Sequence, residues 1–251
     1  MKMVRDSLIL SLCILLGLGA RVAIAAEVQV GFGQQKPPFV FIEEKRGLEL
    51  DLVREALAYR GHTMQATLLP KRRLQRMLHA KKLDGMASLR ISESSPGVYF
   101  SAPYITFNNF AISKLSANHV INSFEDLRGK RVLAWPNARK DLGADFARVV
   151  VPPVGMRGLY SEHEQTEQNR FFWRYPNAVI LIDKSIFGWF RQQLSISLDT
   201  SEEVVLHPIF EGGSRYGVAF HNEVIRNDFD AGLAQLHSTG RYQALVESYI
   251  K

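Results

Sequence analysis

The hydrophobic positions from residue 27 onward alternate between strand-like and helix-like spacing. Apolar residues occupy alternate positions over 28–32, which predicts a half-buried strand. Over 48–57 they recur at helical spacing, and Gly61 follows where a helix C-cap is expected. A second strand is expected at 64–69. Strand, helix and strand in this order are typical of an α/β protein.

The alternation continues to the end of the chain. Further strands are expected at 86–89, 131–134, 178–182 and 216–220, and further helices at 186–193 and 224–237. Ser123 and Asp126 form a capping-box pattern ahead of the strand that starts the second βαβ unit. The last strand and helix resume the first pattern, so two lobes with two crossings between them explain the order.

Polar residues gather at a predicted strand end within 70–104. A basic helix with apolar residues at helical spacing ends at Asp84-Gly85, and a short strand follows. The residues that leave the C-terminal end of this strand together are Ser88, Arg90 and Ser92. Ligands of open α/β sheets lie just beyond such strand ends, so this segment predicts a ligand cleft.

The N-terminus has the pattern of a secretory signal peptide over 1–25. Lys2 and Arg5 precede an apolar run, and small residues at 23–25 suit a cleavage site near Ala25 or Ala26. The run is shorter than the about 20 residues of a spanning helix. Cys13 lacks the small residues that precede a lipidated cysteine, so no acyl anchor is expected. We therefore expect a periplasmic protein.

Composition and charge argue against several function classes. The net charge is +6, but basic residues are spread along the chain, so no nucleic-acid partner is expected. The chain has no Gly-x-Ser-x-Gly elbow and no phosphate loop, and its histidines are not set at metal-ligand spacing. Gly31-Phe32-Gly33 lacks the third glycine of a dinucleotide fingerprint. We expect no cofactor, no metal and no catalysis.

An ordered series of short motifs resembles a known family. The motifs are Lys36-Pro37-Pro38-Phe39, Gly47-Leu48-Glu49-Leu50-Asp51-Leu52, Leu83-Asp84-Gly85, Phe100-Ser101-Ala102-Pro103-Tyr104, Phe124-Glu125-Asp126-Leu127-Arg128-Gly129-Lys130-Arg131-Val132 and Tyr216-Gly217-Val218-Ala219-Phe220. They resemble the extracellular solute-binding protein family 3, the periplasmic binders of polar amino-acid ABC importers. The similarity runs from Glu27 to the C-terminus.

The resemblance implies a type II periplasmic binding fold with two α/β lobes joined by a two-stranded hinge. The first lobe would comprise 26–113 and 214–251, and the second 114–213. A monomer of this kind would close on a small polar solute and present the closed form to an ABC permease of the inner membrane.

Family roles transfer to this chain with two departures. The arginine that clasps an α-carboxylate in the family would fall at Ser94 or Ser95, so Arg90 or Arg73 would have to supply a cation. In the second lobe, the residues 134–139 replace the usual glycine and hydroxyl pair. The candidate ligand-binding residues are Phe39, Arg73, Ser88, Arg90, Tyr104, Trp135, Arg139 and Asp183. Asp183 would hold an amine, and Phe39 and Trp135 would stack on the solute.

Seven of the eight candidates, all but Trp135, also have a specific structural interpretation. Phe39 and Tyr104 could pack in a lobe core, and Arg73 and Arg139 could be solvated surface cations. Asp183 could cap the helix that follows it. Ser88 could satisfy local backbone groups, and Arg90 could pair with Glu93.

Two functions besides solute import stay open at this stage. Some relatives of this fold are periplasmic dehydratases of prephenate-like acids, and a Glu or Asp at the cleft could serve as a general acid. A sensor module that reports to a signalling partner is the other alternative.

Overall fold

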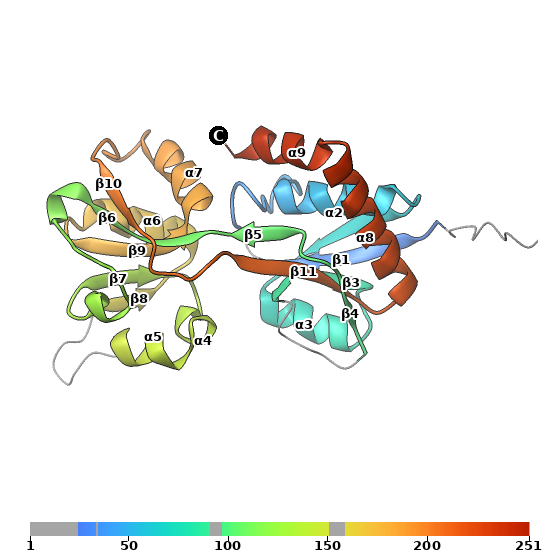
Figure 1. The fold of residues 1–251 in the computed structure, drawn as a ribbon, viewed down its shortest axis with the longest axis horizontal. Helices are drawn as coiled ribbons and strands as arrows, with labels where there is room; N and C mark the ends of the chain where they lie inside the picture. The colour runs from blue at the N-terminus through green and yellow to red at the C-terminus, as the bar shows by residue number, and fades with distance from the viewer. Residues whose placement is uncertain (1–24, 34, 91–96, 151–158, 251) are drawn as a thin grey trace, which may run out of the picture.

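The computed structural model describes residues 25–33, 35–90, 97–150 and 159–250, which form two lobes with a sheet in each (Figure 1). Two extended segments cross between the lobes near the middle of the molecule. This is the type II periplasmic binding architecture that the motifs predicted.

The first lobe is a mixed sheet covered by helices on both faces. Its strands are β1 (Glu27–Phe32), β2 (Thr63–Leu68), β3 (Gly85–Arg90), β4 (Tyr99–Phe100), β5 (Ile105–Phe107) and β11 (Ser214–Phe220). Their order is β2-β1-β3-β11-β4, with β5 also paired to β11. β1 is parallel to β2 and β3, and β11 is antiparallel to its neighbours. The helices are α2 (Leu48–Ala58), α8 (Glu223–Ser238) and α9 (Arg241–Tyr249) on one face and α3 (Lys71–His79) on the other.

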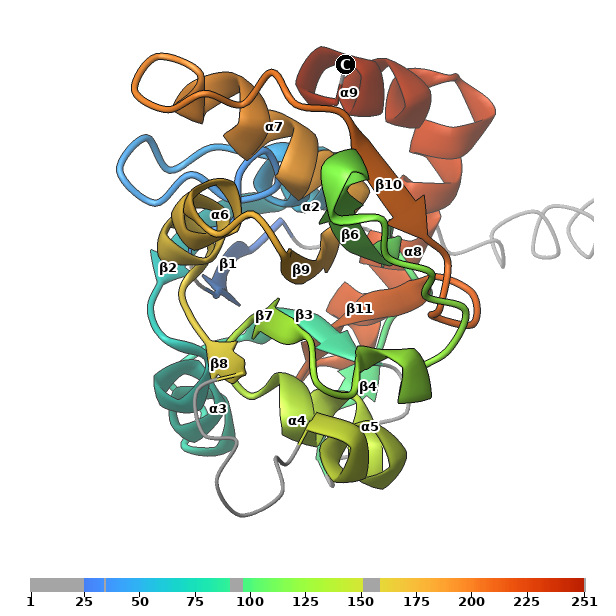
Figure 2. The same cartoon turned by 90° about the vertical axis from the view of Figure 1, so that its left-hand side faces the viewer.

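The second lobe repeats this plan. Its strands are β6 (Asn109–Lys114), β7 (Arg131–Ala134), β8 (Tyr160–Glu162), β9 (Ala178–Asp183) and β10 (Val204–His207), in the order β10-β6-β9-β7-β8. Its helices are α4 (Ala138–Asp141), α5 (Gly143–Val150), α6 (Gln165–Arg174) and α7 (Lys184–Leu194), with 3-10 turns η1 (Leu115–Ala117) and η2 (Glu125–Leu127). Figure 2, turned to face this lobe, shows α6 and α7 on one side of the sheet and α4 and α5 on the other.

The hinge lies where the chain passes from β5 to β6 and returns from β10 to β11. Phe107 pairs with Ser214, so the two crossings are linked where they enter the first lobe. β6 pairs with β9 and β10 and is part of the second sheet. The first crossing therefore lies at Asn108, whereas the sequence placed the lobe boundary at 113–114.

Burial explains why these segments form these elements. All residues of β9 are buried, as expected of a central strand with helices on both faces. α2 buries one apolar stripe against α8. A Cβ at Gly232 of α8 would lie 1.9 Å from the carbonyl oxygen of Ala56, so the close approach of these helices requires glycine.

The elements predicted from hydrophobic spacing are confirmed, with ends shifted by a few residues. The pattern at Ser123 and Asp126 starts no longer helix: Asp126 lies within the short turn η2, and its carboxylate accepts the backbone N–H groups of Asn122 and Ser123. Within the part of the chain that is described, no helix has both the length and the apolar character of a membrane span.

Candidate functional site

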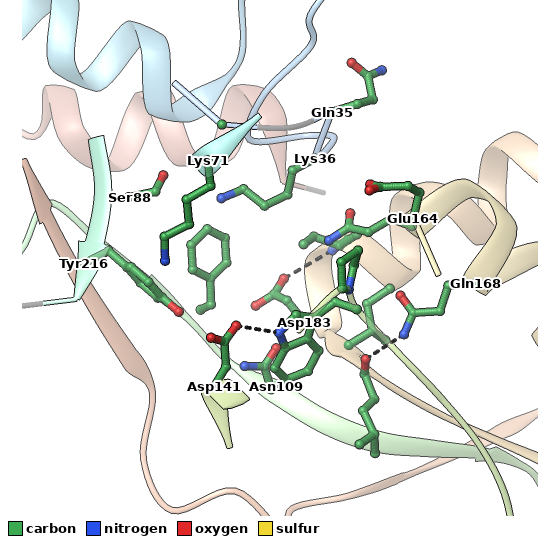
Figure 3. Close-up of a pocket in the computed structure, with 18 of the residues that line it drawn as sticks. Gln35, Lys36, Lys71, Ser88, Asn109, Asp141, Glu164, Gln168, Asp183 and Tyr216 are labelled. Carbon is green, nitrogen blue, oxygen red and sulfur yellow. Dashed lines mark hydrogen bonds between the residues drawn. The ribbon is translucent and has the colours of Figure 1, made fainter. Parts of the chain in front are cut away.

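A pocket of about 180 Å³ lies between the lobes at the hinge (Figure 3). The first lobe contributes polar side chains from Gln35, Lys36, Lys71, Ser88 and Tyr216. The second lobe contributes Trp135, Asp141, Glu164, Gln165, Gln168 and Asp183. The volume is below the roughly 300–1,000 Å³ of drug-sized pockets, so it suits a small solute.

The two walls of the pocket carry opposite charges. Lys36 and Lys71 extend from the first lobe, and the carboxylates of Asp141, Glu164 and Asp183 face them from the second. A solute with separated positive and negative groups would contact both walls. Charge-assisted hydrogen bonds of this kind are stronger than those between neutral groups.

Behind the first wall, Glu49 is fully buried and holds three polar groups in place. Its Oε1 lies 2.6 Å from the Lys36 ammonium. Its Oε2 accepts hydrogen bonds from the Tyr104 hydroxyl at 2.6 Å and from the Ser88 hydroxyl. Burial, with the Glu49 carboxylate next to it, raises the pKa of Tyr104 well above its ordinary value. Tyr104 is therefore a permanent donor to Glu49.

Local backbone geometry brings Glu49 and Ser88 together. The α2 N-terminus docks on a turn, where the Glu49 N–H donates to the Phe39 carbonyl at 3.0 Å. Gly47 has φ 134°, and a Cβ there would lie 2.3 Å from the same carbonyl oxygen, so only glycine allows this contact. Ser88 has φ 57° beside a register shift between β3 and β11. A bulge of this kind redirects a side chain, here toward Glu49.

Asp183 both caps α7 and lines the pocket. Its Oδ1 accepts the N–H groups of Ser185 at 2.8 Å and Ile186 at 3.2 Å. Its Oδ2 accepts the N–H of Asn108 in the hinge at 2.7 Å. Burial raises the pKa of Asp183 despite these donors. A carboxylate has about four acceptor positions, so one more donor can bind here.

Arg90 connects the lobes next to the pocket. Its guanidinium donates to the backbone carbonyl of Asp141 at 3.0 Å and lies 3.4 Å from the Tyr216 hydroxyl. The Asp141 carboxylate accepts the indole N–H of Trp135 at 3.0 Å. Asp141, the last residue of α4, is therefore hydrogen-bonded to Arg90 of the first lobe and to Trp135 of the second.

The predicted site residues fall into three groups. Those in the pocket wall are Ser88, Trp135 and Asp183; those beside or behind it are Arg90 and Tyr104; those away from it are Phe39, Arg73 and Arg139. Ser92, Ser94, Ser95, Glu93 and residues 1–24 lie outside the described residues.

The residues away from the pocket have structural reasons for their positions. Phe39 is buried and packs edge-on against Phe107 at a centroid distance of 4.7 Å. Arg73 is exposed because α3 turns Leu74 and Leu78 toward the sheet. Arg139 is exposed and lies 3.7 Å from Glu162. The cation that α3 contributes to the pocket is Lys71 instead.

Sequence reasoning missed several residues of the site. Lys36 and Glu49 lie within motifs that carried the family resemblance, so a signal for them was present. Lys71 was recognised only as part of a basic helix. Asp141 and Gln168 had no local signal, because only the packing of the second lobe brings them to the pocket. Across the described ranges, no cluster of three or more His, Cys, Asp or Glu side chains is placed to hold a metal ion.

Comparison with known proteins gave one family and many structures. The model of the bacterial extracellular solute-binding proteins, family 3, matches residues 28–251. No curated protein sequence matched significantly.

The similar structures share the fold at low sequence identity. ArgBP from T. maritima, a P235GK mutant, is 20% identical with a TM-score of 0.67, covering 89% of this chain and 94% of that one. The GluR0 ligand-binding core in complex with L-glutamate is 16% identical with a TM-score of 0.71, covering 91% and 100%. The ancestral amino acid-binding protein AncCDT-1, described as a precursor of cyclohexadienyl dehydratase, is 18% identical with a TM-score of 0.67, covering 90% and 95%.

Proposed function

The chain belongs to the bacterial extracellular solute-binding proteins, family 3, and on this premise we propose that it captures a small zwitterionic solute between its lobes. The observation that carries the proposal is the opposite charge of the two pocket walls. An anionic group of the solute would bind Lys36 and Lys71, and an amine would bind Asp183 and Asp141. An amino acid or a related amine has both groups.

Binding at this position would favour the closed arrangement of the lobes. A solute that contacts both walls stabilises the closed form by its difference in affinity for the two forms. In this proposal the closed form is presented to an ABC permease, and the protein acts as a periplasmic monomer. Cell fractionation tests the location: the protein should be recovered in the periplasmic fraction. Solute uptake by cells with and without the protein tests the partner: uptake should be retained only when the protein is present.

The binding test uses the chain from residue 26 onward. A thermal-shift screen against polar amino acids, amines and organic acids is expected to find solutes that raise the melting temperature, because a ligand that prefers the folded state stabilises it. Calorimetry then measures the affinity of the best solute. A broad library without a single stabilising solute would contradict the proposal.

Two variants test the wall assignment. Lys71→Met and Asp183→Asn should each weaken binding about tenfold or more, because each removes a charged partner of the solute. Lys82→Met, an exposed lysine beyond α3, is the matched control and should leave the affinity unchanged. Unchanged affinity in both pocket variants would remove these residues from the site.

The same protein tests the enzymatic alternative. Incubation with prephenate or arogenate is expected to give no aromatic product, since the proposed role of the pocket carboxylates is to hold an amine. Formation of phenylpyruvate or phenylalanine would replace the binding proposal with a dehydratase.

A further inference from the structure

The first turn of α6 forms part of the second-lobe wall through two amides, Gln165 and Gln168. They are three residues apart and therefore lie on the same side of the helix. We call this pair the amide wall. Glu164, which precedes it, also lines the pocket, and Figure 3 shows Glu164 and Gln168 on the same side of the cavity.

The orientation of the Gln168 amide follows from its partners. Gln168 is fully buried, and its Nε2 donates to the carbonyl oxygens of Leu181 at 2.9 Å and Leu133 at 3.1 Å. Both partners are acceptors, so the amide nitrogen must face them and the flipped arrangement is excluded. Gln168 Oε1 is thereby directed away from the two strands.

Both amides of the wall have an acceptor without a donor. Gln168 Oε1 and Gln165 Oε1 are inaccessible to solvent and accept no hydrogen bond from any described residue. Buried acceptors without partners are unfavourable, and nearly all buried polar atoms in proteins are paired. Asn169 Oδ1 and Trp173 Nε1 of the same helix also have no partner among the described residues, but these residues do not line the pocket. Among these α6 atoms, the two oxygens of the amide wall are the ones placed to accept donors from a ligand.

The charges around the amide wall indicate which donor group of the solute fits there. Asp141, Glu164 and Asp183 line the same pocket, and the α6 N-terminus offers only about half a positive charge against them. The indole ring of Trp135 provides an aromatic face that attracts cations. We propose that the amide wall binds a cationic nitrogen group with several N–H donors, such as an ammonium or guanidinium, at the end of the solute. This assignment rests on the proposed function of the pocket.

Paired probes test the proposal by calorimetry. L-Lysine and L-norleucine have the same four-carbon side chain, but the terminal carbon carries an ammonium group in lysine and only hydrogen in norleucine. L-Arginine and L-glutamate extend the set. Wild-type protein is expected to bind lysine or arginine at least about tenfold more tightly than norleucine and glutamate.

Variants of the amide wall should change this preference. Gln165→Leu and Gln168→Leu should reduce the lysine or arginine affinity about tenfold and leave that for norleucine unchanged. Gln165→Glu should retain the preference, because it keeps an acceptor. Gln192→Leu, the same change at an exposed position of α7, is the control. Gln168→Leu also removes two hydrogen bonds to the sheet and could prevent folding. In that case the Gln165 variants alone test the amide-wall assignment.

The outcomes separate this proposal from the proposed function. Tighter binding of glutamate or norleucine than of the cationic probes, or full retention of the preference in the Gln165→Leu variant, overturns the amide-wall assignment and leaves solute binding intact. Absence of binding by every probe and by every solute of the wider library overturns both.

Discussion

At the scale of single residues, the most unusual feature is a fully buried carboxylate, Glu49. Its charge is compensated by Lys36 at 2.6 Å and by hydroxyl donors from Tyr104 and Ser88. Buried charges persist only when they are paired and hydrogen-bonded, and removal of one partner leaves the other without compensation. Glu49 therefore positions the Lys36 ammonium at the pocket and also contributes to folding.

Glu49→Gln should lower the free energy of unfolding by about 3 kcal/mol, because the Lys36 ammonium loses its counter-charge in a partly buried site. Urea denaturation followed by circular dichroism measures this. Glu55→Gln, on the same helix, is the control; its ion pair with Arg241 is partly exposed and should contribute about 1 kcal/mol or less. Equal effects of the two substitutions would contradict the role given to Glu49.

His207 makes stability depend on pH. Burial lowers its pKa below the ordinary 6.5, and the nearby His119 adds to the effect. At pH values between 6.5 and the lowered pKa, His207 therefore binds a proton in the unfolded chain but not in the folded chain. The free energy of unfolding should fall as the pH is lowered through this range.

The test compares urea midpoints at about pH 7.5 and about pH 5.5. His207→Gln should show a smaller decrease on acidification than the wild type, since glutamine does not titrate. The decrease that remains comes from the other groups, which both proteins share. The same decrease in both proteins would show that His207 is not responsible.

At the scale of elements, two helices of the second lobe begin at the pocket. α6 presents the amide wall, and α7 begins at Asp183, whose carboxylate also accepts the Asn108 N–H in the hinge. A single side chain thus joins a helix start, a crossing between lobes and the pocket wall. Stability and solute binding are therefore coupled at Asp183.

Asp183→Ala should cost about 1 to 2 kcal/mol of stability, because it removes the α7 cap, and should also weaken solute binding. Asp183→Asn keeps a capping oxygen, so it should recover much of the stability but not the affinity. Asn222 caps α8: its Oδ1 accepts the Val224 N–H at 2.8 Å, and the residue does not line the pocket. Asn222→Ala should therefore lower the stability and leave the solute affinity unchanged. Denaturation and calorimetry on the three variants separate the two roles.

At the scale of the whole molecule, Arg90 is a contact between the lobes. Its hydrogen bond to the Asp141 carbonyl joins β3 of the first lobe to α4 of the second. The lobes are also linked by the hinge, which consists of two chain crossings, and by the edge-on contact of Phe41 with Trp189 of α7 at a centroid distance of 5.8 Å. Loss of the Arg90 hydrogen bond should therefore loosen the contact between β3 and α4 and shift the relative position of the lobes.

Arg90→Ala should increase the radius of gyration of the solute-free protein in small-angle X-ray scattering, because the hydrogen bond across the cleft is lost. A saturating solute should reduce the difference from wild type, since the solute itself contacts both walls. Arg76→Ala, at an exposed position of α3, is the control. Superimposable curves for all three proteins would exclude a role for Arg90 in lobe position.

Much of the architecture was predictable from local pattern. β9 is identified by its continuous apolar run, because a strand buried on both faces is apolar throughout. α2 is identified by helical spacing, because burial of one stripe imposes the helical period. The site was predictable only in part. Arg73 and Lys71 both lie in the first turn of α3, and the orientation of that helix on its sheet decides that Lys71 reaches the pocket.

By itself, the sequence determined the α/β class, the order of the elements and the family, because these depend on hydrophobic period and on motifs read along the chain. Tertiary structure alone decided which charges and amides meet: Lys36 with Glu49, Arg90 with Asp141, and Gln168 with two strands of the second sheet. Such pairs join positions far apart in the chain. They depend on strand order, helix orientation and a bulge at Ser88, none of which the local alternation of apolar and polar residues encodes.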